Sequence, residues 1–403
     1  MDIFLFNPDT DLALAANKQA YTASMPVRQM ALGLAALPVW YATPGACILL
    51  PDEIFEEQEK YILRMNKAFA MDVRPLSYSH LSGIKEACFH PWGWNKSVRN
   101  RLLRAGVSPS CLPDEAQLEH LRQLSSREQV RRVLECFQED PDYCGLSMNF
   151  SDEHSCQVFA DAHPEGVVFK SPWSSSGKGL CWCRNGYDTR HKAWCTKVIR
   201  EQGLVTAQPY YHRLSDFAME FKHDGHGNVE FIGYSLFHTN EQGAYLGNVL
   251  ASDEIIEKKL SQGLDTNVLP RIRKKMAEVL ALFDYQGYMG VDMMVCQEEQ
   301  TGRHLVHPCV EMNWRMNMGI VSHELMQRFV HPSCEGIMQV ENLALSSLGK
   351  YDLEHDMNKT LDCLENGKVH KGKIILSWGN KSSFVAYASI YQGANCTASL
   401  SLP

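Results

Sequence analysis

The sequence predicts an α/β region with a mainly parallel sheet, followed by two α+β lobes. In residues 1–100, short apolar strands alternate with amphipathic helical stretches, which is typical of a layered α/β fold. From about residue 150, strands occur in clusters and hairpins around single helices, which is typical of α+β lobes. The chain has 403 residues and is 45% hydrophobic, so it is long enough for two or three domains of ordinary size.

The first region alternates strands with helices. Asp2–Phe6 and Cys47–Leu50 are predicted strands, and the spacing of apolar residues in Pro51–Ala70 predicts an amphipathic helix. HPWGWNKSVRNRLLRAG joins a tight turn to a basic helix, and Pro113–Phe137 is predicted to be mostly helical. A polar link with Pro, Asp and Gly follows, and we expect a domain boundary near residues 120–140.

The second region is expected to build strands around one glycine- and serine-rich loop. Its predicted strands are Gly166–Ser171, Leu180–Cys183, Leu204–Gln208, Phe217–Phe221 and Val229–Phe237, the last two forming an antiparallel pair. A helix at Leu269–Phe283 then precedes a hairpin of Tyr288–Cys296 and His304–Asn313. In the last part of the chain, Leu353–Leu364 resembles a helix and Lys373–Trp378 a strand.

The composition argues against several classes of protein. The net charge of −8 leaves no basic field for a phosphate backbone, so no nucleic-acid partner is expected. The longest apolar stretches, such as Ala31–Tyr41, are shorter than the roughly 20 residues that span a bilayer, and no membrane partner is expected. The amino terminus lacks the basic segment of a signal peptide. The fourteen scattered cysteines favour reduced thiols and a cytoplasmic location.

One cysteine cluster raises a zinc-site hypothesis. Cys181, Cys183, His191 and Cys195 form C-x-C followed by H-x3-C, without the C-x2-C spacing of common zinc sites. We favour the alternative, in which Cys181 and Cys183 lie on one strand face and pack as small apolar groups.

The last hairpin carries the strongest chemical signal. Glu311 and Asn313 lie two residues apart on a strand and therefore share a face. A turn near Thr301–Gly302 would put Asp292 opposite Glu311. Two carboxylates and an amide oxygen then converge, and such oxygen ligands suit Mg2+. Pro308 predicts an edge strand or a bulge. The alternative is a solvent-facing strand with acidic residues.

Two further segments suggest a nucleotide site. In VVFKSPWSSSGKGL, Lys170 ends an apolar strand before a flexible S-S-S-G-K-G loop that can wrap a polyphosphate, although it is not a Walker A motif. A surface linker is the alternative. In GLVTAQPYYHRLSDFAMEF, a strand ends at Gln208-Pro209 and Glu220 follows on the next strand. This segment could hold an adenine and a ribose, or be an ordinary hairpin.

The order of these motifs resembles the ATP-grasp superfamily over roughly residues 120–325, and EMNWRMNMG is similar to its E-x-N-x-R signature. The resemblance implies a Rossmann-like domain (1–125) before a two-lobed ATP-grasp domain (126–325), with lobe 1 at about 126–207 and lobe 2 at about 208–325. The C-terminal segment 326–403 is expected to pack on the lobes, bracing them or contributing to a homodimer.

The resemblance also implies roles for individual residues. Lys170 would hold the α- and β-phosphates, and Glu220 would bind the ribose. Arg315 would face the transferred phosphate, with Lys178 of the lid as a second catalytic cation. The lid residues are Ser174, Ser175, Ser176, Gly177, Lys178 and Gly179, the adenine hinge is Val205–Tyr210 with Gln208, Pro209 and Tyr210, and the ligands of two Mg2+ ions are Asp292, Glu311 and Asn313. Two residues depart from the family pattern, since Arg127 stands where an earlier Lys is usual and Gln208 where an acidic residue is common.

This set predicts an ATP-dependent ligase that uses Mg2+ and activates a carboxylate as an acylphosphate for attack by an amine or similar nucleophile. The alternatives are a phosphotransferase with an alcohol acceptor, and a nucleotide-binding protein without turnover. Both expected substrates are small molecules.

Substrate contacts are predicted in two places. The loops that follow the first strands carry Asn7, Asp9 and Asp11, and then Trp92, Trp94, Asn95 and Arg99, where open α/β sheets bind ligands. The alternative is that these residues cap helices and fill the domain interface. The polar stretch Tyr234–Asn248 is expected to line the acceptor side, with Tyr245 and Asn248 as candidates.

Overall fold

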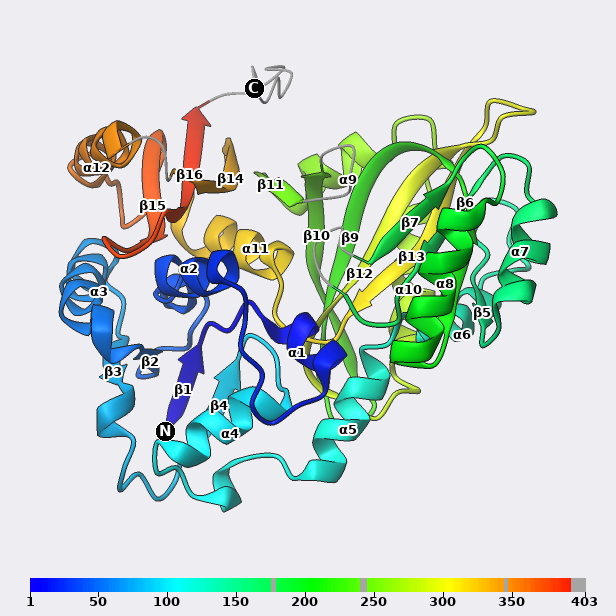
Figure 1. The fold of residues 1–403 in the computed structure, drawn as a ribbon. Coiled ribbons are helices and arrows are strands. Elements are labelled where there is room, and N and C mark those ends of the chain that lie inside the picture. Colours follow the sequence, from blue (N-terminus) through cyan, green and yellow to red (C-terminus); the bar gives the residue numbers. More distant parts are fainter. Residues whose placement is uncertain (175–178, 240–244, 344–346, 393–403) are drawn as a thin grey trace.

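A four-stranded parallel sheet opens the computed structural model, which describes residues 1–174, 179–239, 245–343 and 347–392 (Figure 1). Its strand order is β3-β2-β1-β4, and every pairing is parallel. The elements of this region are β1 (Asp2–Leu5), α1 (Thr10–Ala16), α2 (Met25–Gly33), β2 (Cys47–Leu50), α3 (Phe55–Phe69), β3 (Arg74–Ser77), β4 (Cys88–Pro91) and α4 (Lys96–Arg104). The predicted α/β layer is confirmed.

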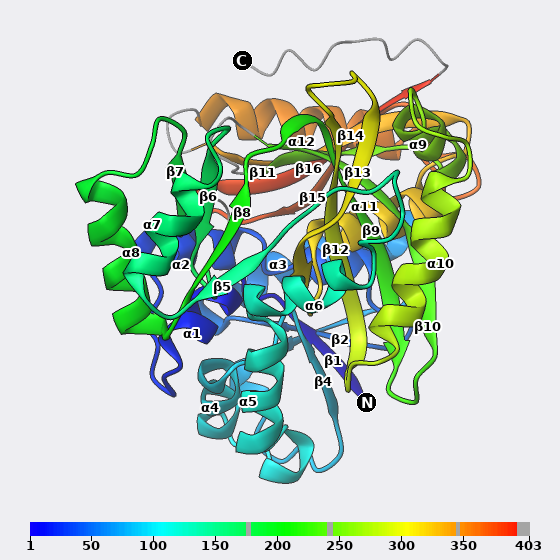
Figure 2. The same cartoon turned by 90° about the vertical axis from the view of Figure 1, so that its right-hand side faces the viewer.

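A small antiparallel sheet forms the next layer, with the order β5-β8-β6-β7. Its strands are β5 (Met148–Phe150), β6 (Val167–Lys170), β7 (Leu180–Cys183) and β8 (Val205–Pro209), and the helices around it are α5 (Glu115–Leu124), α6 (Val130–Glu135), α7 (Glu153–Asp161) and α8 (Thr189–Gln202). Figure 2 shows this sheet, with α7 and α8, to one side of the long strands that follow it in the chain.

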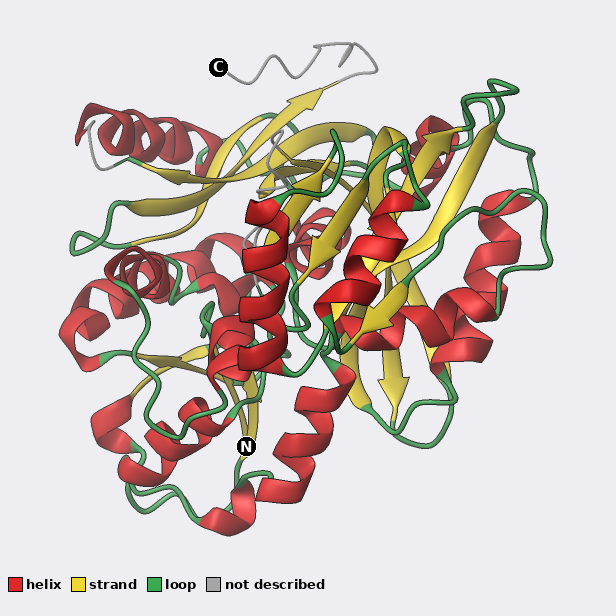
Figure 3. Cartoon of the chain, turned by 45° about the vertical axis from the view of Figure 1, so that its right-hand side comes forward, coloured by secondary structure: helices red, strands yellow, loops and turns green. Residues whose placement is uncertain are grey.

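A large antiparallel sheet crosses the molecule in the order β13-β12-β9-β10-β11-β14-β16-β15 (Figure 3). Its strands are β9 (His212–Asp224), β10 (Val229–Thr239), β11 (Tyr245–Leu250), β12 (Gln286–Gln297), β13 (His304–Asn313), β14 (Cys334–Asn342), β15 (Gly372–Trp378) and β16 (Phe384–Gln392). The accompanying helices are α9 (Asp253–Leu260), α10 (Val268–Leu280), α11 (Met318–Phe329) and α12 (Ser347–Leu361). The last three strands therefore extend the same sheet as the central ones.

The hairpin of β12 and β13 has the register expected from its sequence, with Asp292 opposite Glu311. Beyond this pair the register shifts, because Met294 lies opposite His307. Pro308 falls next to the shifted stretch, and β13 is an edge strand of the sheet. A bulged edge strand tolerates proline because no neighbouring strand needs its missing N–H group.

The C-terminal strands share a hydrophobic core with the N-terminal region. Trp40, Ile48 and Ile62 lie in one buried cluster with residues of α11, β15 and β16. Trp40 also donates a hydrogen bond from Nε1 to the Leu376 carbonyl at 2.7 Å. In Figure 1 the C-terminal elements lie beside α2 and α3. Among the described helices, none combines the length and apolar character that a bilayer crossing requires.

Candidate active site

One face of the large sheet collects the acidic side chains. On β12, Asp292 pairs with Glu311 of β13 and with Ala218 of β9, while Gly290 pairs with Asn313 and with Glu220. Directly paired residues point to the same side of a sheet, so Glu220, Asp292, Glu311 and Asn313 share one face. The intervening residues of β9 and β12 point the other way into the core beneath α10.

The predicted metal ligands converge. Asn313 donates from Nδ2 to Oδ2 of Asp292 at 3.2 Å. Desolvation, followed by the nearby charge of Glu311, raises the pKa of Asp292 to about 7. A proton or a cation must offset these two carboxylates when they lie so close together. Carboxylate and amide oxygens are ligands that Mg2+ accepts, so the donor set fits that ion.

Arg127 joins the two sheets through Glu311. It begins the short turn that leads into α6, and its guanidinium donates from one nitrogen to both carboxylate oxygens of Glu311 at 2.9 Å. The other terminal nitrogen donates to the Ser171 carbonyl at 2.9 Å and to the Ser174 hydroxyl. Arg127 is only 5% exposed, and its buried Nε has no hydrogen-bond partner among the described residues. Arg127 therefore contacts Glu311, one of the predicted metal ligands.

Lys170 lies at the end of β6, in the gap between the two sheets. Its Nζ donates to Oε1 of Gln208 at 2.6 Å and to the Val310 carbonyl at 3.4 Å. Burial, together with the charge of Arg127, lowers the pKa of Lys170 to about 8. The structure thus brings Lys170 and Gln208 together. Pro209 pairs with Val167 at the opposite end of β6, and Tyr210 packs against Trp182 there.

The lid predicted from the sequence is described only at its two ends. The Ser171 N–H donates to the Gly179 carbonyl at 2.8 Å. Gly179 has a φ of +70°, and a Cβ there would lie 2.6 Å from Cβ of Ser174, so glycine is needed at this turn. The predicted residues Ser175, Ser176, Gly177 and Lys178 lie outside the described residues.

Glu220 lies away from the predicted hinge. Strand β9 starts at His212, just after the hinge, and Glu220 comes two residues beyond Ala218, the partner of Asp292. Its side chain is 1% exposed and accepts a hydrogen bond from Asn317 Nδ2 at 2.7 Å. Burial raises its pKa to about 8. Glu220 therefore lies on the far side of Asp292 from the hinge, and its ribose role stays a prediction.

Asp216 and His307 lie nearer the hinge, and sequence reasoning missed both. Asp216 shares the face of Ala218 and accepts hydrogen bonds from Arg213 and Thr239. His307 is fully buried, its ring faces Tyr211 at 5.2 Å, and neither of its nitrogens has a partner among the described residues. Alternation along β9 could have revealed Asp216, whereas the shifted register of β13 hid His307.

Arg315 contacts the N-terminal region. Its guanidinium donates to both carboxylate oxygens of Asp11 in α1, at 2.9 and 2.7 Å. The next residue, Met316, donates its N–H to the Trp92 carbonyl at 3.0 Å. A cavity at this junction is lined by Asp11 and Leu14, by 172–174 and by 311–315. The first region and both sheets therefore meet at Arg315.

The other predicted substrate residues fall into two groups. Asn7 and Trp92 are buried, with Asn7 hydrogen-bonded to Thr10 and Gly93 and Trp92 packed on Phe6. Both residues are therefore engaged in contacts within the N-terminal region, and their substrate role stays a prediction.

Tyr245 and Asn248 form a polar chain beside Glu220. The Tyr245 hydroxyl donates to Oδ1 of Asn248 at 2.5 Å, and Nδ2 of Asn248 donates to the Ser235 hydroxyl at 2.6 Å. A Cβ on Gly319 would lie within 3 Å of both Ser235 Oγ and Glu220 Oε1. The chain therefore reaches the face of the sheet that carries the metal-ligand candidates.

The zinc hypothesis for the cysteine cluster is not supported. Among the described residues, the groups whose ligand atoms converge do not include Cys181, Cys183, His191 or Cys195. His191 accepts a hydrogen bond at Nδ1 from the Asp188 N–H in the capping box of α8. Cys183 and Cys195 are buried in the hydrophobic cluster of the small sheet, where they pack as apolar groups.

Three solved structures resemble this chain over most of its length. N5-carboxyaminoimidazole synthetase from Staphylococcus aureus, complexed with ADP, has a TM-score of 0.50 at 10% identity and covers 98% of this chain and 93% of its own. The biotin carboxylase–β-γ-ATP complex from Campylobacter jejuni has a TM-score of 0.52 at 12% identity, with coverages of 96% and 86%. The biotin carboxylase domain of Hydrogenobacter thermophilus 2-oxoglutarate carboxylase, a dimer with MgADP, ADP and bicarbonate, scores 0.50 at 11% identity, covering 96% and 85%.

No protein-family model matches the sequence, and no curated protein matches it significantly. The structural likenesses nevertheless show that the chain has the fold of the ATP-grasp superfamily. An N-terminal parallel sheet precedes the antiparallel sheets that carry the candidate site, as the sequence predicted.

Proposed function

We propose that this protein is an ATP-dependent ligase that activates a carboxylate as an acylphosphate and passes the acyl group to an amine or similar nucleophile. The observation that carries the proposal is the convergence of Asp292, Glu311 and Asn313 at the junction that also holds Arg315. ADP, an ATP analogue and MgADP are bound in the similar structures, which supports ATP and Mg2+ as ligands here.

Asp292, Glu311 and Asn313 would hold Mg2+. When bound, Mg2+ supplies positive charge that offsets the negative charge of the nucleotide phosphates. Arg127 would turn its guanidinium towards the phosphates, because Mg2+ would take over the role of the positive charge beside Glu311. The buried Nε of Arg127 has no hydrogen-bond partner among the described residues. Because buried donors are usually hydrogen-bonded, this supports a bound ligand atom next to Nε.

The cationic side chains would position the reacting groups. Lys170, at the end of its strand, would contact phosphate oxygens, which favour the protonated amine and offset its desolvation. Arg315 would orient the acceptor carboxylate or the transferred phosphoryl group, and Asp11 fixes its guanidinium in place. A carboxylate oxygen of the substrate attacks the γ-phosphorus and ADP leaves. The amine then attacks the acyl carbon, loses a proton and releases phosphate.

The nucleotide would lie between the two antiparallel sheets. Gln208 from the small sheet and His307 from the large sheet would lie at the adenine end, Lys170 would lie towards the phosphates, and Asp216 is a candidate for the ribose. Tyr245 and Asn248 would line the acceptor side, beside Glu220. The boundaries at residues 125 and 325, the cytoplasmic location and the homodimer stay predictions.

Calorimetry tests the nucleotide site. The protein is titrated with a non-hydrolysable ATP analogue with and without Mg2+, beside Glu311→Gln and the matched control Glu299→Gln, which removes an exposed carboxylate from the turn of the same hairpin. We expect Mg2+-dependent binding that weakens at least tenfold in Glu311→Gln and is unchanged in Glu299→Gln. Equal binding by all three proteins, or no binding, would remove the metal-site assignment.

Product analysis tests the reaction class. Carboxylate and amine pools are screened for ADP release, and the products are examined by phosphorus NMR. Free phosphate with a coupled amide supports the ligase. Phosphate retained on the acceptor would identify a phosphotransferase, and binding without turnover would identify a nucleotide-binding protein.

A further inference from the structure

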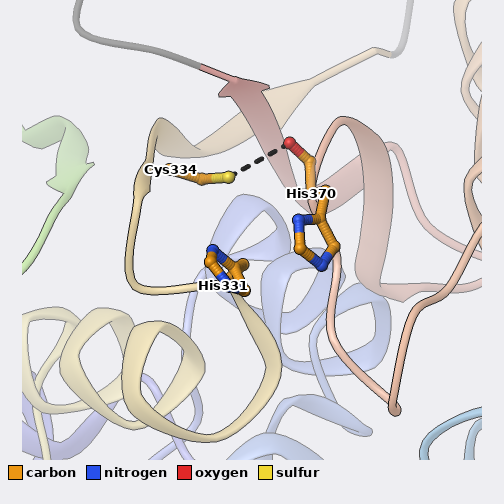
Figure 4. A group of neighbouring side chains, drawn as sticks. All are labelled: His331, Cys334 and His370. Carbon is orange, nitrogen blue, oxygen red and sulfur yellow. Dashed lines mark hydrogen bonds between the residues drawn. The ribbon is translucent and has the colours of Figure 1, made fainter.

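Two histidines and a cysteine meet at the base of the C-terminal strands, outside the candidate active site (Figure 4). The ligand atoms of His331, Cys334 and His370 all lie within 4.8 Å of one another. His331 comes from the turn after α11, Cys334 is the first residue of β14, and His370 comes from the connection between α12 and β15. In Figure 4 the thiol and the two rings face a common space.

Backbone hydrogen bonds hold these three residues together. The His331 N–H donates to the Val369 carbonyl at 3.0 Å, and the Val369 N–H donates to the Phe329 carbonyl at 2.8 Å. The Cys334 N–H donates to the His331 carbonyl at 2.9 Å, which closes the turn. The Cys334 thiol itself donates to the His370 carbonyl at 3.2 Å. The arrangement is therefore built by the fold before any ligand arrives.

The donor chemistry selects the class of ligand. Two imidazoles and a thiol are nitrogen and sulfur donors of the kind that Zn2+ prefers. Cys334 is fully buried, and the two rings are 4.2 Å apart with an angle of 26° between their planes. Glu365, a largely exposed carboxylate, lies 3.5 Å from Nε2 of His370.

We propose that His331, Cys334 and His370 bind a zinc ion, which ties the turn before β14 to the connection before β15. On binding, the Cys334 thiol loses its proton to solvent and its sulfur bonds to the metal. One ring nitrogen of each histidine and the Cys334 sulfur ligate the ion, and water takes the fourth position. The ion fixes two segments that enter neighbouring parts of the large sheet.

A second group with similar residues provides an internal comparison. Asp2, Cys88 and His90 also bring their ligand atoms within 4.8 Å of one another. In that group Asp2 and Cys88 are exposed, and His90 already pairs with Asp2 at 2.8 Å. An exposed carboxylate–histidine pair needs no metal to offset its charge. This group also lacks the buried thiol that Cys334 gives to the His331, Cys334 and His370 group.

Cobalt binding tests the site. The full chain is stripped with a chelator, kept in excess Mg2+ to occupy oxygen-rich sites, and titrated with Co2+, which gives a thiolate-to-cobalt absorption band in the near ultraviolet when a cysteine ligates it. We expect one equivalent of Co2+ with this band, and its displacement by Zn2+. Cys334→Ser is expected to lose the band, and His331→Ala to bind at least tenfold more weakly.

Cys88→Ser and Cys363→Ser are the matched controls, since each removes an exposed thiol, and both are expected to keep the band. Absence of the band in the parent protein would overturn the proposal, as would its loss in Cys88→Ser together with its retention in Cys334→Ser. The parent measurement does not depend on any variant folding. In addition, Zn2+ is expected to raise the unfolding temperature of the parent but not that of His331→Ala.

Discussion

Glu220 shows how a single carboxyl group can be enclosed beside a charged site. Gly290 and Gly319 leave the room for it, because a Cβ at either position would lie within 2.5 Å of its carboxylate oxygens. Asn317 is the hydrogen-bond donor to it, at 2.7 Å. Burial raises its pKa from 4.5 to about 8, so at neutral pH the side chain is mostly protonated and can donate a hydrogen bond as well as accept one.

The raised pKa of Glu220 predicts a pH-dependent stability. Below pH 4.5 both the folded and the unfolded state hold the proton, so the residue has no net effect. As the pH rises from 4.5 to about 8, only the unfolded state releases it, and the free energy of unfolding falls. We therefore expect Glu220→Gln to be more stable than the parent by about 3 to 5 kcal/mol at pH 8.5 and nearly equal to it at pH 4.5.

Urea unfolding at these two pH values measures the difference. Glu230→Gln on β10 is the control, because that carboxylate is exposed and its substitution should have little effect at either pH. The same stability difference for Glu220→Gln at both pH values would contradict the raised pKa.

At the scale of single elements, the spacing of apolar residues along the sequence predicted several helices and strands with nearly the observed bounds. β2 and β7 have the predicted bounds, α10 begins one residue before and ends three residues before its prediction, and Asp292 lies opposite Glu311 as the hairpin register required. β14 and β16 were not predicted. β14 pairs with β11 and with β16, which lie far from it in the sequence, whereas β16 forms a hairpin with β15 just before it. Strand propensity depends strongly on such packing context, so it marks isolated strands weakly.

The candidate site also contains features that could be predicted from the sequence and features that could not. The triad on β12 and β13 could be predicted because i and i+2 positions on a strand share a face. The ion pairs of Arg127 with Glu311 and of Arg315 with Asp11 join residues 184 and 304 positions apart. Only the packing of whole elements brings such residues together, and the sequence gives no spacing rule for it.

The first turn of α11 carries a prediction about element packing. In an ordinary helix interior, Gly→Ala stabilises by about 1 kcal/mol. At Gly319 we expect the opposite, a loss of about 1 to 3 kcal/mol, because the new Cβ would lie 2.0 Å from Oε1 of Glu220 and 2.7 Å from Oγ of Ser235. Gly379→Ala is the control, since its nearest contacts are at 3.5 Å.

Thermal and urea unfolding of both glycine variants compare the two positions. A Gly319→Ala protein as stable as the parent would mean that Glu220 can leave its enclosure at no cost. Nucleotide titration of the same variant then reports whether the displaced carboxyl group disturbs the neighbouring triad.

At the scale of the whole molecule, the first and last parts of the chain form one core. Trp40 is fully buried and contacts Phe69 and Phe329 edge to face. Tyr61 donates a hydrogen bond to the Leu376 carbonyl at 2.7 Å, and the Ser377 hydroxyl donates to the Gly33 carbonyl at 2.9 Å. The strands that extend the large sheet therefore also cover the N-terminal helices.

This shared core predicts a cooperative loss of stability in Trp40→Ala. Truncating a buried tryptophan typically lowers the free energy of unfolding by about 3 to 5 kcal/mol. Because Trp40 packs in a core shared by the first and last parts of the chain, we expect both parts to be destabilised together. We expect one urea transition by circular dichroism, shifted to lower urea, with the N-terminal and C-terminal regions cut by protease at the same urea concentration. Leu282→Ala is the control, because that side chain is 75% exposed. Separate transitions for the two regions would contradict a common core.

The contact between Trp40 and Leu376 also has a consequence for synthesis. The two residues are 336 positions apart, and chains are made at about 5 to 20 residues per second, so Trp40 emerges about 17 to 67 s before its partner strand exists. During that interval the apolar faces of α2 and α3 have no permanent cover. These faces are therefore open to solvent and to other chains for longer than those of a protein whose first domain closes on itself.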